Sequence, residues 1–221
     1  MTRCDPHKLP FNSARSGRIL RVLLLTFGLL AAAGGGYYGY VMFVDRNFHE
    51  VVPDKLYRSA RPTDEKLREW TKAHGIRTVI SIGGGAEREE YTPVIDAAEE
   101  LDLTFHGTRW STSTMPTRKK MLQFIEWIEE SPKPILIHCR RGADRTGLPC
   151  VIGAMALGGW TYEEARPQLS LRYWHVNNDP RHVDGPLLMY EDYREKEGAD
   201  TGGWPEFRKW VVEHYHPTFE E

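Results

Sequence analysis

The stretch HCRRGADRTG, residues His138–Gly147, places a cysteine six positions before an arginine, with a glycine between them and Thr-Gly at its end. The apolar run PILIH (residues 134–138) leads directly into Cys139 and predicts a short buried strand. After it, TGLPCVIGAMALGG (residues 146–159) predicts a buried helix that ends at two glycines, despite Pro149 near its start. Strand, glycine-containing loop and helix in this order direct backbone N–H groups and a positive helix end toward one point. The stretch therefore predicts an anion-binding loop.

The residue types in this loop favour phosphoryl transfer. Cys139 lies close in sequence to Arg140, Arg141 and Arg145, and a thiol beside arginines and a helix N-terminus forms a thiolate readily. Gly142 permits backbone turns that other residues avoid, while a guanidinium at Arg145 can bind a tetrahedral oxyanion in bidentate fashion. A thiolate beside a bound phosphate is an in-line nucleophile, so we expect transfer to sulfur and then hydrolysis by water. The loop supplies the positive charge, and we expect neither a metal nor a cofactor.

The other residues of the motif are expected to support this chemistry. Gly142 and Ala143 offer backbone N–H groups to the oxyanion, and Arg140 and Arg141 add positive charge. We expect the Thr146 hydroxyl to hydrogen-bond Cys139 in its thiolate form. His138 is expected to fix the strand end through its ring nitrogens rather than to act as a base.

The sequence beyond His49 alternates short β-rich runs with amphipathic helices, without repeats, which predicts an α/β layer architecture. RPTDEKLREWTKAHG (residues 61–75) predicts a helix with Thr63 as N-cap and Gly75 just past its end. Strands are expected over residues 55–59, 76–82 and 103–107, and further helices over residues 92–101, 117–130 and 204–215. RYWHVNNDPRHVDGP (residues 172–186) is expected to be a polar loop.

The N-terminal region contains a candidate membrane anchor. VLLLTFGLLAAAGGGYYGYVMFV (residues 22–44) runs for 23 residues without a charge, long enough as a helix to cross a hydrocarbon core of about 30 Å. The alternative is a cleaved signal peptide, with residues 22–30 as its apolar region and residues 31–33 as its cleavage site. The apolar run continues well beyond those alanines, which favours the anchor.

Charges on the two sides of the apolar run predict its orientation. Arg15, Arg18 and Arg21 precede it, so the positive-inside rule places a tail of residues 1–21 in the cytoplasm. A domain of residues 48–221 then lies outside the cytoplasm, which means the periplasm in a Gram-negative cell. We expect a single-pass protein of the cell membrane.

The motif H-C-x5-R-T-G resembles the signature of the protein tyrosine phosphatases, including the dual-specificity enzymes. NFHEVVPDKLYRSARP (residues 47–62) and IRTVISI (residues 76–82) are similar to the first part of bacterial phosphatases of the dual-specificity type. The resemblance covers roughly residues 47–171. It implies a central, largely parallel sheet flanked by helices, a phosphocysteine intermediate, Cys139 as nucleophile and Arg145 as the phosphate clamp.

The general acid departs from that family pattern. The family usually supplies an Asp from a movable loop, but the corresponding TRWSTSTMPT (residues 108–117) has no carboxylate. GADRT resembles the loop of myotubularin-like and some bacterial phosphatases, in which an Asp of the signature loop serves, so Asp144 is the candidate acid. The alternative is a structural ion pair of Asp144 with Arg140 or Arg141.

Other residues of chemical interest are expected to be structural. The acids around Arg88, in SIGGGAEREE, are expected to form a solvated start of a helix rather than to act as catalysts: Glu87, Glu89 and Glu90. Cys150 is expected to be a small core residue, with a resolving thiol as the alternative. Four histidines lack ligand spacing and are expected at the surface or as caps: His175, His182, His214 and His216.

Composition and motif together restrict the function. A formal net charge of −2 argues against nucleic acid as a partner, and three scattered cysteines provide neither a disulfide framework nor a zinc site. We expect a hydrolase of phosphomonoesters, phosphotyrosine first, acting on a phosphorylated protein or a small molecule. Arg140 and Arg141 could meet a second phosphate, which makes a phosphoinositide or inositol phosphate phosphatase the alternative. A second alternative function is a membrane-tethered phosphate-binding module without catalysis. The length of the motif disfavours a sulfurtransferase or an arsenate reductase.

Overall fold

The N-terminal part of the chain forms one long helix in the computed structural model, which describes residues 13–176, 179–198 and 202–217. Helix α1 (Ser13–Gly39) continues into a π-helical segment, η1 (Tyr40–Val44). Arg18–Val44 is long and apolar enough to cross a membrane, a test that a signal sequence near an N-terminus also passes. The apolar helix is thus confirmed and its insertion stays a prediction. Of the expected cytoplasmic tail, residues 1–12 lie outside the described residues.

A mixed sheet is the centre of the second compact unit, which begins at Asp45. Its five strands lie in the order β1-β2-β5-β3-β4, and all neighbouring pairs are parallel except β1 with β2. The strands are β1 (His49–Val52), β2 (Leu56–Ala60), β3 (Thr78–Ser81), β4 (Thr104–Gly107) and β5 (Ile135–Cys139). The largely parallel sheet is confirmed, and β1 is an additional edge strand that the sequence did not predict.

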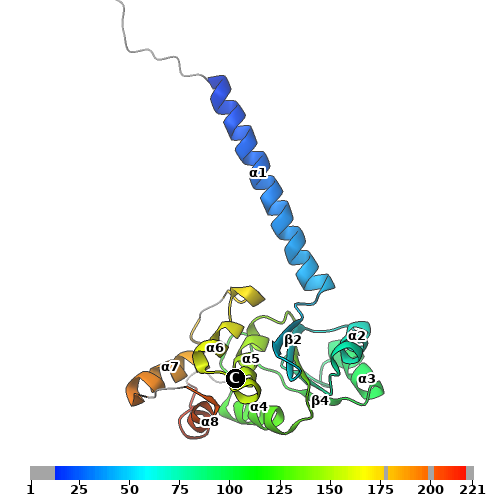
Figure 1. Ribbon diagram of the computed structural model, residues 1–221, viewed down its shortest axis with the longest axis vertical. Coiled ribbons are helices and arrows are strands. Elements are labelled where there is room, and N and C mark those ends of the chain that lie inside the picture. Colours follow the sequence, from blue (N-terminus) through cyan, green and yellow to red (C-terminus); the bar gives the residue numbers. More distant parts are fainter. Residues whose placement is uncertain (1–12, 177–178, 199–201, 218–221) are drawn as a thin grey trace, which may run out of the picture. The chain divides into compact units, whose positions relative to one another are not determined.

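Helices cover both faces of this sheet (Figure 1). The α-helices are α2 (Asp64–His74), α3 (Thr92–Glu100), α4 (Arg118–Glu130), α5 (Asp144–Gly158), α6 (Tyr162–Ala165), α7 (Gly185–Glu197) and α8 (Trp204–Glu213). Short 3₁₀ turns are η2 (Glu89–Tyr91), η3 (Arg166–Gln168) and η4 (Leu171–Tyr173). Helices α2 and α3 pack on one face of the sheet, while α4 and α5 pack on the other with α6, α7 and α8 around them.

Local capping signals explain where several helices begin and end. The Thr63 hydroxyl accepts a hydrogen bond from the N–H of Lys66 at 3.2 Å, and Gly75 ends α2 with φ +65°. Both caps confirm the sequence prediction. The helix after the anion-binding motif begins earlier than predicted, because Asp144 and Arg145 already belong to its first turn. The positive end of α5 therefore lies within the motif.

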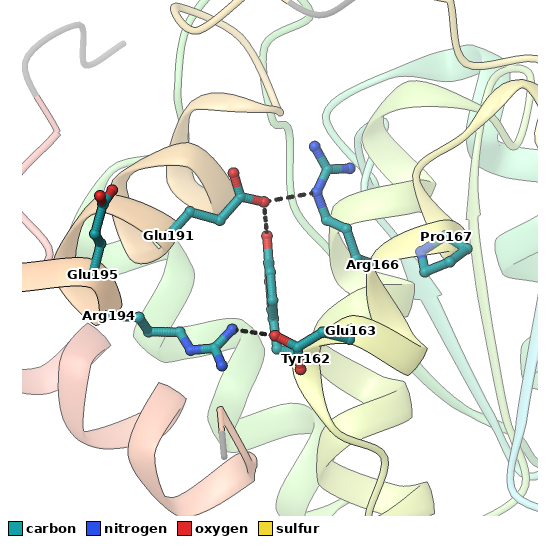
Figure 2. Close-up of a pocket in the computed structure, with 7 residues that line it drawn as sticks. All are labelled: Tyr162, Glu163, Arg166, Pro167, Glu191, Arg194 and Glu195. Atoms are coloured by element: carbon teal, nitrogen blue, oxygen red, sulfur yellow. Dashed lines mark hydrogen bonds and ion pairs between the residues drawn. The ribbon is translucent and has the colours of Figure 1, made fainter. Parts of the chain in front are cut away.

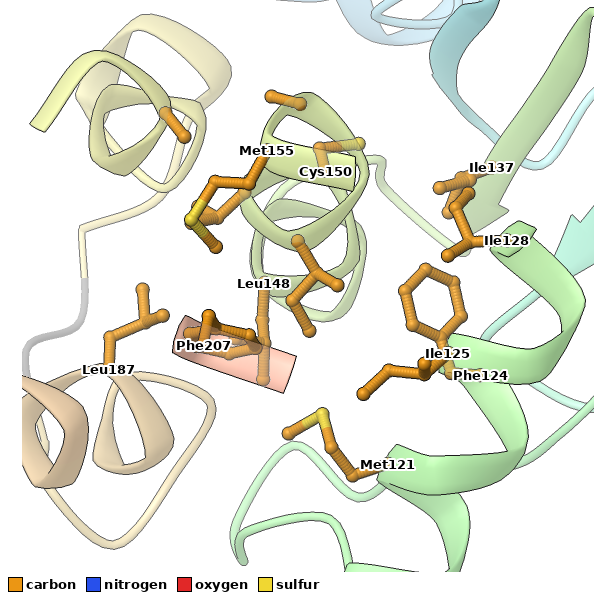
Figure 3. Close-up of a cluster of buried hydrophobic side chains, with 14 of the residues drawn as sticks. Met121, Phe124, Ile125, Ile128, Ile137, Leu148, Cys150, Met155, Leu187 and Phe207 are labelled. Atoms are coloured by element: carbon orange, nitrogen blue, oxygen red, sulfur yellow. The ribbon is translucent and has the colours of Figure 1, made fainter. Parts of the chain in front are cut away.

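The core holds β5 and α5 firmly in place. Ile135 and Ile137 of β5 belong to the cluster on the α5 face, whereas Leu136 belongs to the cluster beneath α2 and α3. Figure 3 shows Leu148, Cys150 and Met155 of α5 among side chains of α4, α7 and α8. Each fully buried aliphatic side chain stabilises the fold by about 1.5–3 kcal/mol. The loop between β5 and α5 is consequently anchored at both ends by buried elements.

Candidate active site

The anion-binding motif lies at the carboxyl end of the central strand. In the sheet register Cys139 is the last residue of β5, opposite Ala60 of β2, and His138 lies between Ser59 and Ser81. Cys139 is only 3% exposed. Residues 140–143 then turn into α5, whose first turn carries Arg145. The structure thus brings the predicted nucleophile, glycine loop, helix N-terminus and arginine to one edge of the sheet.

Gly142 is required at its position for two reasons. Its φ is +70°, in the left-handed region that residues with a Cβ rarely adopt. In addition, a Cβ built there would lie 2.5 Å from the backbone nitrogen of Ala60 and 2.5 Å from the carbonyl carbon of Ser59. The loop therefore packs directly on the end of β2.

Two buried residues far from the motif hold the carbonyl groups of the loop. Asn47 Nδ2 donates to the carbonyl of Arg141 at 3.2 Å, and Arg58 Nη2 donates to the carbonyl of Gly142 at 2.8 Å. Since C=O and the following N–H point in opposite directions across a trans peptide, the N–H groups of Gly142 and Ala143 point away from Asn47 and Arg58. This orientation agrees with the predicted role of these two amides as oxyanion donors.

Arg58 is also a buried cation next to the nucleophile. It is completely buried, stacks 3.7 Å over the ring of Tyr173, and donates to the carbonyl and side chain of Gln168. Burial lowers the pKa of Arg58, against the opposing effect of the thiols of Cys150 and Cys139 and the phenol of Tyr173. Among the described residues no carboxylate forms an ion pair with Arg58, so its charge remains available to an anion in the loop.

Arg145 borders a basic cleft, which we define by Arg88, Arg109, Lys120 and Arg145 together with the hydroxyl-bearing segment of residues 111–113. The cleft has a volume of about 550 Å³. Arg145 Nη1 donates to the carbonyl of Trp110 at 3.5 Å, and Lys120 donates to the carbonyl of Arg109 at 2.6 Å. Burial and the nearby Arg109 lower the pKa of Lys120. The cleft can accept a second anionic group beside one held in the loop.

Asp144 is half-exposed in the first turn of α5, and its partner is a histidine. Its Oδ1 lies 2.8 Å from Nδ1 of His175, and within the described residues it forms no ion pair with Arg140 or Arg141, which are exposed. The expected alternative ion pair with these arginines is thus replaced by one with His175. The expectation that His175 lies at the surface is wrong, because its side chain is 2% exposed.

The remaining predicted residues are buried beside the loop. The Thr146 hydroxyl is buried without a hydrogen-bond partner among the described residues, so its expected bond to Cys139 stays a prediction. His138 stacks on Tyr91 with ring centroids 6.2 Å apart, and its ring nitrogens also lack well-formed hydrogen bonds within the described chain. Burial, with Arg61 nearby, lowers the pKa of His138 to about 3, which keeps the ring neutral.

The acids after β3 make local contacts. Glu87 accepts a hydrogen bond from the N–H of Gly85, and Glu90 lies 3.1 Å from both Arg61 and Arg88. Cys150 is fully buried in α5, and burial raises the pKa of its thiol to about 11. These contacts agree with a structural role for the acids after β3 and for Cys150.

The chain is similar in sequence to one protein family and to a curated relative. The family described as "DSP-PTPase phosphatase fused to NAD+ Kinase" matches residues 44–152. A curated relative, inositol diphosphatase DSP3 of Arabidopsis thaliana, is 29% identical over 120 residues, which cover 53% of this chain and 57% of the relative. The chain thus spans less than two thirds of that relative's length.

Solved structures share the fold. Tk-PTP in the active form has a TM-score of 0.53 and 20% identity, with 67% of this chain and 97% of that chain covered. PTPMT1 has a TM-score of 0.51 and 16% identity, with 69% of this chain and 98% of that chain covered. The expected fold, like that of the protein tyrosine phosphatases, is confirmed.

Proposed function

We propose that this chain is a cysteine-dependent phosphatase of the protein tyrosine and dual-specificity type and that it hydrolyses phosphomonoesters through Cys139, which its similarity to the matching family over residues 44–152 and to the curated relative supports. The observation that carries the proposal is the loop: Cys139 ends the central strand, Arg145 lies in the first turn of α5, and Asn47 and Arg58 hold the intervening carbonyls. Amides, guanidinium and helix end together can stabilise the charge on the transferring phosphoryl group.

The proposed reaction has two steps. The Cys139 sulfur attacks phosphorus, an S–P bond forms, the P–O ester bond breaks, and the leaving oxygen takes a proton from Asp144. Water then attacks phosphorus and gives a proton to Asp144, the S–P bond breaks, and inorganic phosphate leaves. Arg145 binds two phosphate oxygens throughout. Metal and cofactor have no part in this scheme.

Phosphotyrosine, expected from the resemblance, is the first substrate we propose, in a protein or as a small molecule. The basic cleft supports a second candidate, a polyphosphorylated small molecule such as an inositol phosphate or a phosphoinositide headgroup. Arg88, Arg109 and Lys120 lie beside Arg145 in that cleft, and the curated relative is named an inositol diphosphatase. A non-catalytic phosphate-binding module is the third possibility, although it leaves the buried thiol without a use.

The proposed location follows from the apolar helix and the arginines before it. We propose that residues 22–44 anchor the protein in the cell membrane, with residues 1–21 in the cytoplasm and a phosphatase domain of residues 48–221 outside it. In a Gram-negative cell this domain lies in the periplasm.

The function is tested by turnover of the full chain in detergent on three substrate classes: phosphotyrosine peptides, phosphoserine peptides and inositol phosphates. We expect phosphate release that vanadate inhibits and a chelator does not affect. Cys139→Ser should abolish turnover, and Cys150→Ala, the change of a buried cysteine in the core, is the matched control that should retain it. Lack of turnover with every substrate supports the binding module, and full activity in Cys139→Ser removes the nucleophile from the mechanism.

The substrate class is tested separately in the basic cleft. Arg109→Gln should raise KM for inositol polyphosphates while leaving KM for a simple aryl phosphate nearly unchanged, because only the former carries a second phosphate. Equal effects on both substrates would argue against the cleft as a second phosphate site.

A further inference from the structure

A buried histidine connects Asp144 to a second carboxylate. His175 Nδ1 lies 2.8 Å from Asp144 Oδ1, and Nε2 lies 3.1 Å from Asp184 Oδ1. The side chains of His175 and Asp184 are 2% and 1% exposed, whereas that of Asp144 is 40% exposed. Asp144 is therefore the solvent-facing end of this chain of three residues, and it is adjacent to Arg145.

Both nitrogens of the His175 ring face carboxylate oxygens. An ionised carboxylate only accepts hydrogen bonds, so both ring nitrogens must donate, and a ring that donates from both is an imidazolium. Burial alone would lower the pKa of His175, but its hydrogen bonds to Asp144 and Asp184 outweigh this and raise the pKa to about 9. At neutral pH the ring thus carries the proton and faces an oxygen of Asp144 and one of Asp184.

Charged groups of both signs lie on the elements around His175. They are Asp144 of α5, Asp184 just before α7, Arg166 of η3, and the neighbouring pair Asp179 and His182, which lie 3.7 Å apart. Arg166 approaches Asp184 at 3.8 Å and binds Glu191 at 3.2 Å. Arg166 and Glu191 line a cavity of about 620 Å³, and Figure 2 shows the ion pair between them. Arg166 is thus a counter-charge for the buried Asp184, whereas Asp144 is the carboxylate of the three-residue chain that faces solvent.

A carboxylate paired with an imidazolium has no proton to give to a leaving group. We propose, on the basis of the function proposed above, that His175 is a positioning residue that holds Asp144 beside the loop and stores the proton that Asp144 passes to the leaving oxygen.

The proton transfers balance over the two steps of the reaction. As the P–O ester bond breaks, the Nδ1 proton of His175 moves to the Asp144 carboxylate, and Asp144 passes a proton to the leaving oxygen. His175 becomes a neutral ring that still donates from Nε2 to Asp184. When water attacks the phosphocysteine, its proton passes to Asp144 and from there back to Nδ1. The enzyme returns to its initial state without any co-reactant.

A merely structural role of the Asp144–His175 pair predicts different kinetics. If His175 only fixes the loop, its loss damages phosphate binding whatever group leaves. If it stores the proton, its loss matters for poor leaving groups, such as alkyl phosphates, and much less for an activated aryl phosphate that needs little protonation. The pH dependence also differs, because only a proton store sets the alkaline limb of kcat.

The test compares wild type, His175→Asn and a control, His106→Asn, using the full chain in detergent. An asparagine at position 175 can still donate a hydrogen bond to Asp144 but stores no proton. His106 of β4 is a part-buried histidine whose Nε2 is hydrogen-bonded to the Ser131 hydroxyl, away from the loop. In wild type we expect kcat for alkyl phosphates to fall as the pH rises through about 9, where His175 loses its proton. In His175→Asn that limb should move to lower pH, and kcat at pH 7 should fall by about 10²–10⁴-fold. His106→Asn should behave as wild type.

Vanadate affinity should be unchanged in all three proteins, since the loop is intact. An active His175→Asn whose kcat falls at the same alkaline pH as that of wild type would overturn the proposal that His175 stores the proton. Equal losses of kcat on alkyl and activated aryl phosphates would overturn it too. If His175→Asn does not fold, the same limb measured in Asp184→Asn should shift toward lower pH. Selective ¹⁵N-histidine NMR of wild type should show an imidazolium at pH 7, and a neutral ring there would also overturn the proposal. Absence of turnover in wild type would instead refute the proposed function, and the two failures are thereby distinguished.

Discussion

Gly142→Ala should inactivate the protein by moving the loop, and Gly159→Ala is its matched control. Both glycines have left-handed backbones, with φ of +70° and +66°, and both flank α5. A Cβ at Gly159 meets nothing within 4 Å, whereas one at Gly142 lies 2.5 Å from the nitrogen of Ala60. The pair therefore separates the backbone strain, which is common to both, from the steric conflict, which only Gly142 has.

The expected magnitudes follow from these contacts. A residue with a Cβ in the left-handed region costs about 1–2 kcal/mol, so both variants should lose about that much unfolding free energy. Ordinary non-bonded carbon contacts lie at about 3.5–4.0 Å, and the Cβ at position 142 must therefore move by roughly 1 Å. A displacement of about 1 Å in a catalytic group can cost about 10²-fold in rate. We expect kcat/KM of Gly142→Ala to fall by about that factor and kcat/KM of Gly159→Ala to stay near wild type.

The assay is hydrolysis of an aryl phosphate by the full chain in detergent, with thermal unfolding and vanadate binding measured on the same samples. Gly142→Ala should bind vanadate more weakly at a temperature where it is still folded. The same kcat/KM and vanadate affinity in both variants would refute the inference that the contact between the loop and β2 sets the geometry of the oxyanion site.

Three further predictions concern stability and location. Arg58→Met should lower the unfolding free energy by about 3 kcal/mol in chemical denaturation, because buried carbonyls lose their donor. Arg61→Met, which removes an exposed ion pair, should lower it by at most about 1 kcal/mol. Equal losses in the two variants would contradict the structural role of Arg58. The pKa of His175 is raised to about 9, so above about pH 6.5 the folded state retains a proton that the unfolded state has lost. The free energy of unfolding should therefore fall by up to about 3 kcal/mol as the pH rises from about 6.5 to 9. This decline should be absent in His175→Asn. Protease added outside intact cells, after permeabilisation of any outer membrane, should digest the phosphatase domain and spare an N-terminal tag, whereas a soluble mature form beginning near Gly34 would establish a cleaved signal peptide.

Features encoded by neighbouring residues could be predicted from the sequence. The caps of α2, at Thr63 and Gly75, depend on side-chain chemistry and backbone freedom at single positions. The motif from Cys139 to Arg145 is likewise local, since a strand, a turn and a helix follow each other within a few residues. The resemblance to a known family then supplied the parallel sheet.

Features that depend on distant segments were missed. Asn47 and Arg58 reach the loop from 94 and 84 residues away, and nothing in their own neighbourhoods indicates which carbonyls they will bind. His175 lies in an irregular segment after η4 without periodicity, so its burial between two acids could not be inferred. One signal was available: NFHEVVPDKLYRSARP resembled the family, and this stretch contains both Asn47 and Arg58.

The most direct measurement is a rapid acid quench of the wild-type protein during turnover, followed by mass spectrometry of its peptides. A phosphocysteine mechanism predicts a phosphate group on the peptide that contains Cys139, present while substrate lasts and absent both without substrate and in Cys139→Ser. Turnover without a phosphorylated Cys139 peptide, or with the phosphate on another residue, would contradict nucleophilic catalysis by this cysteine.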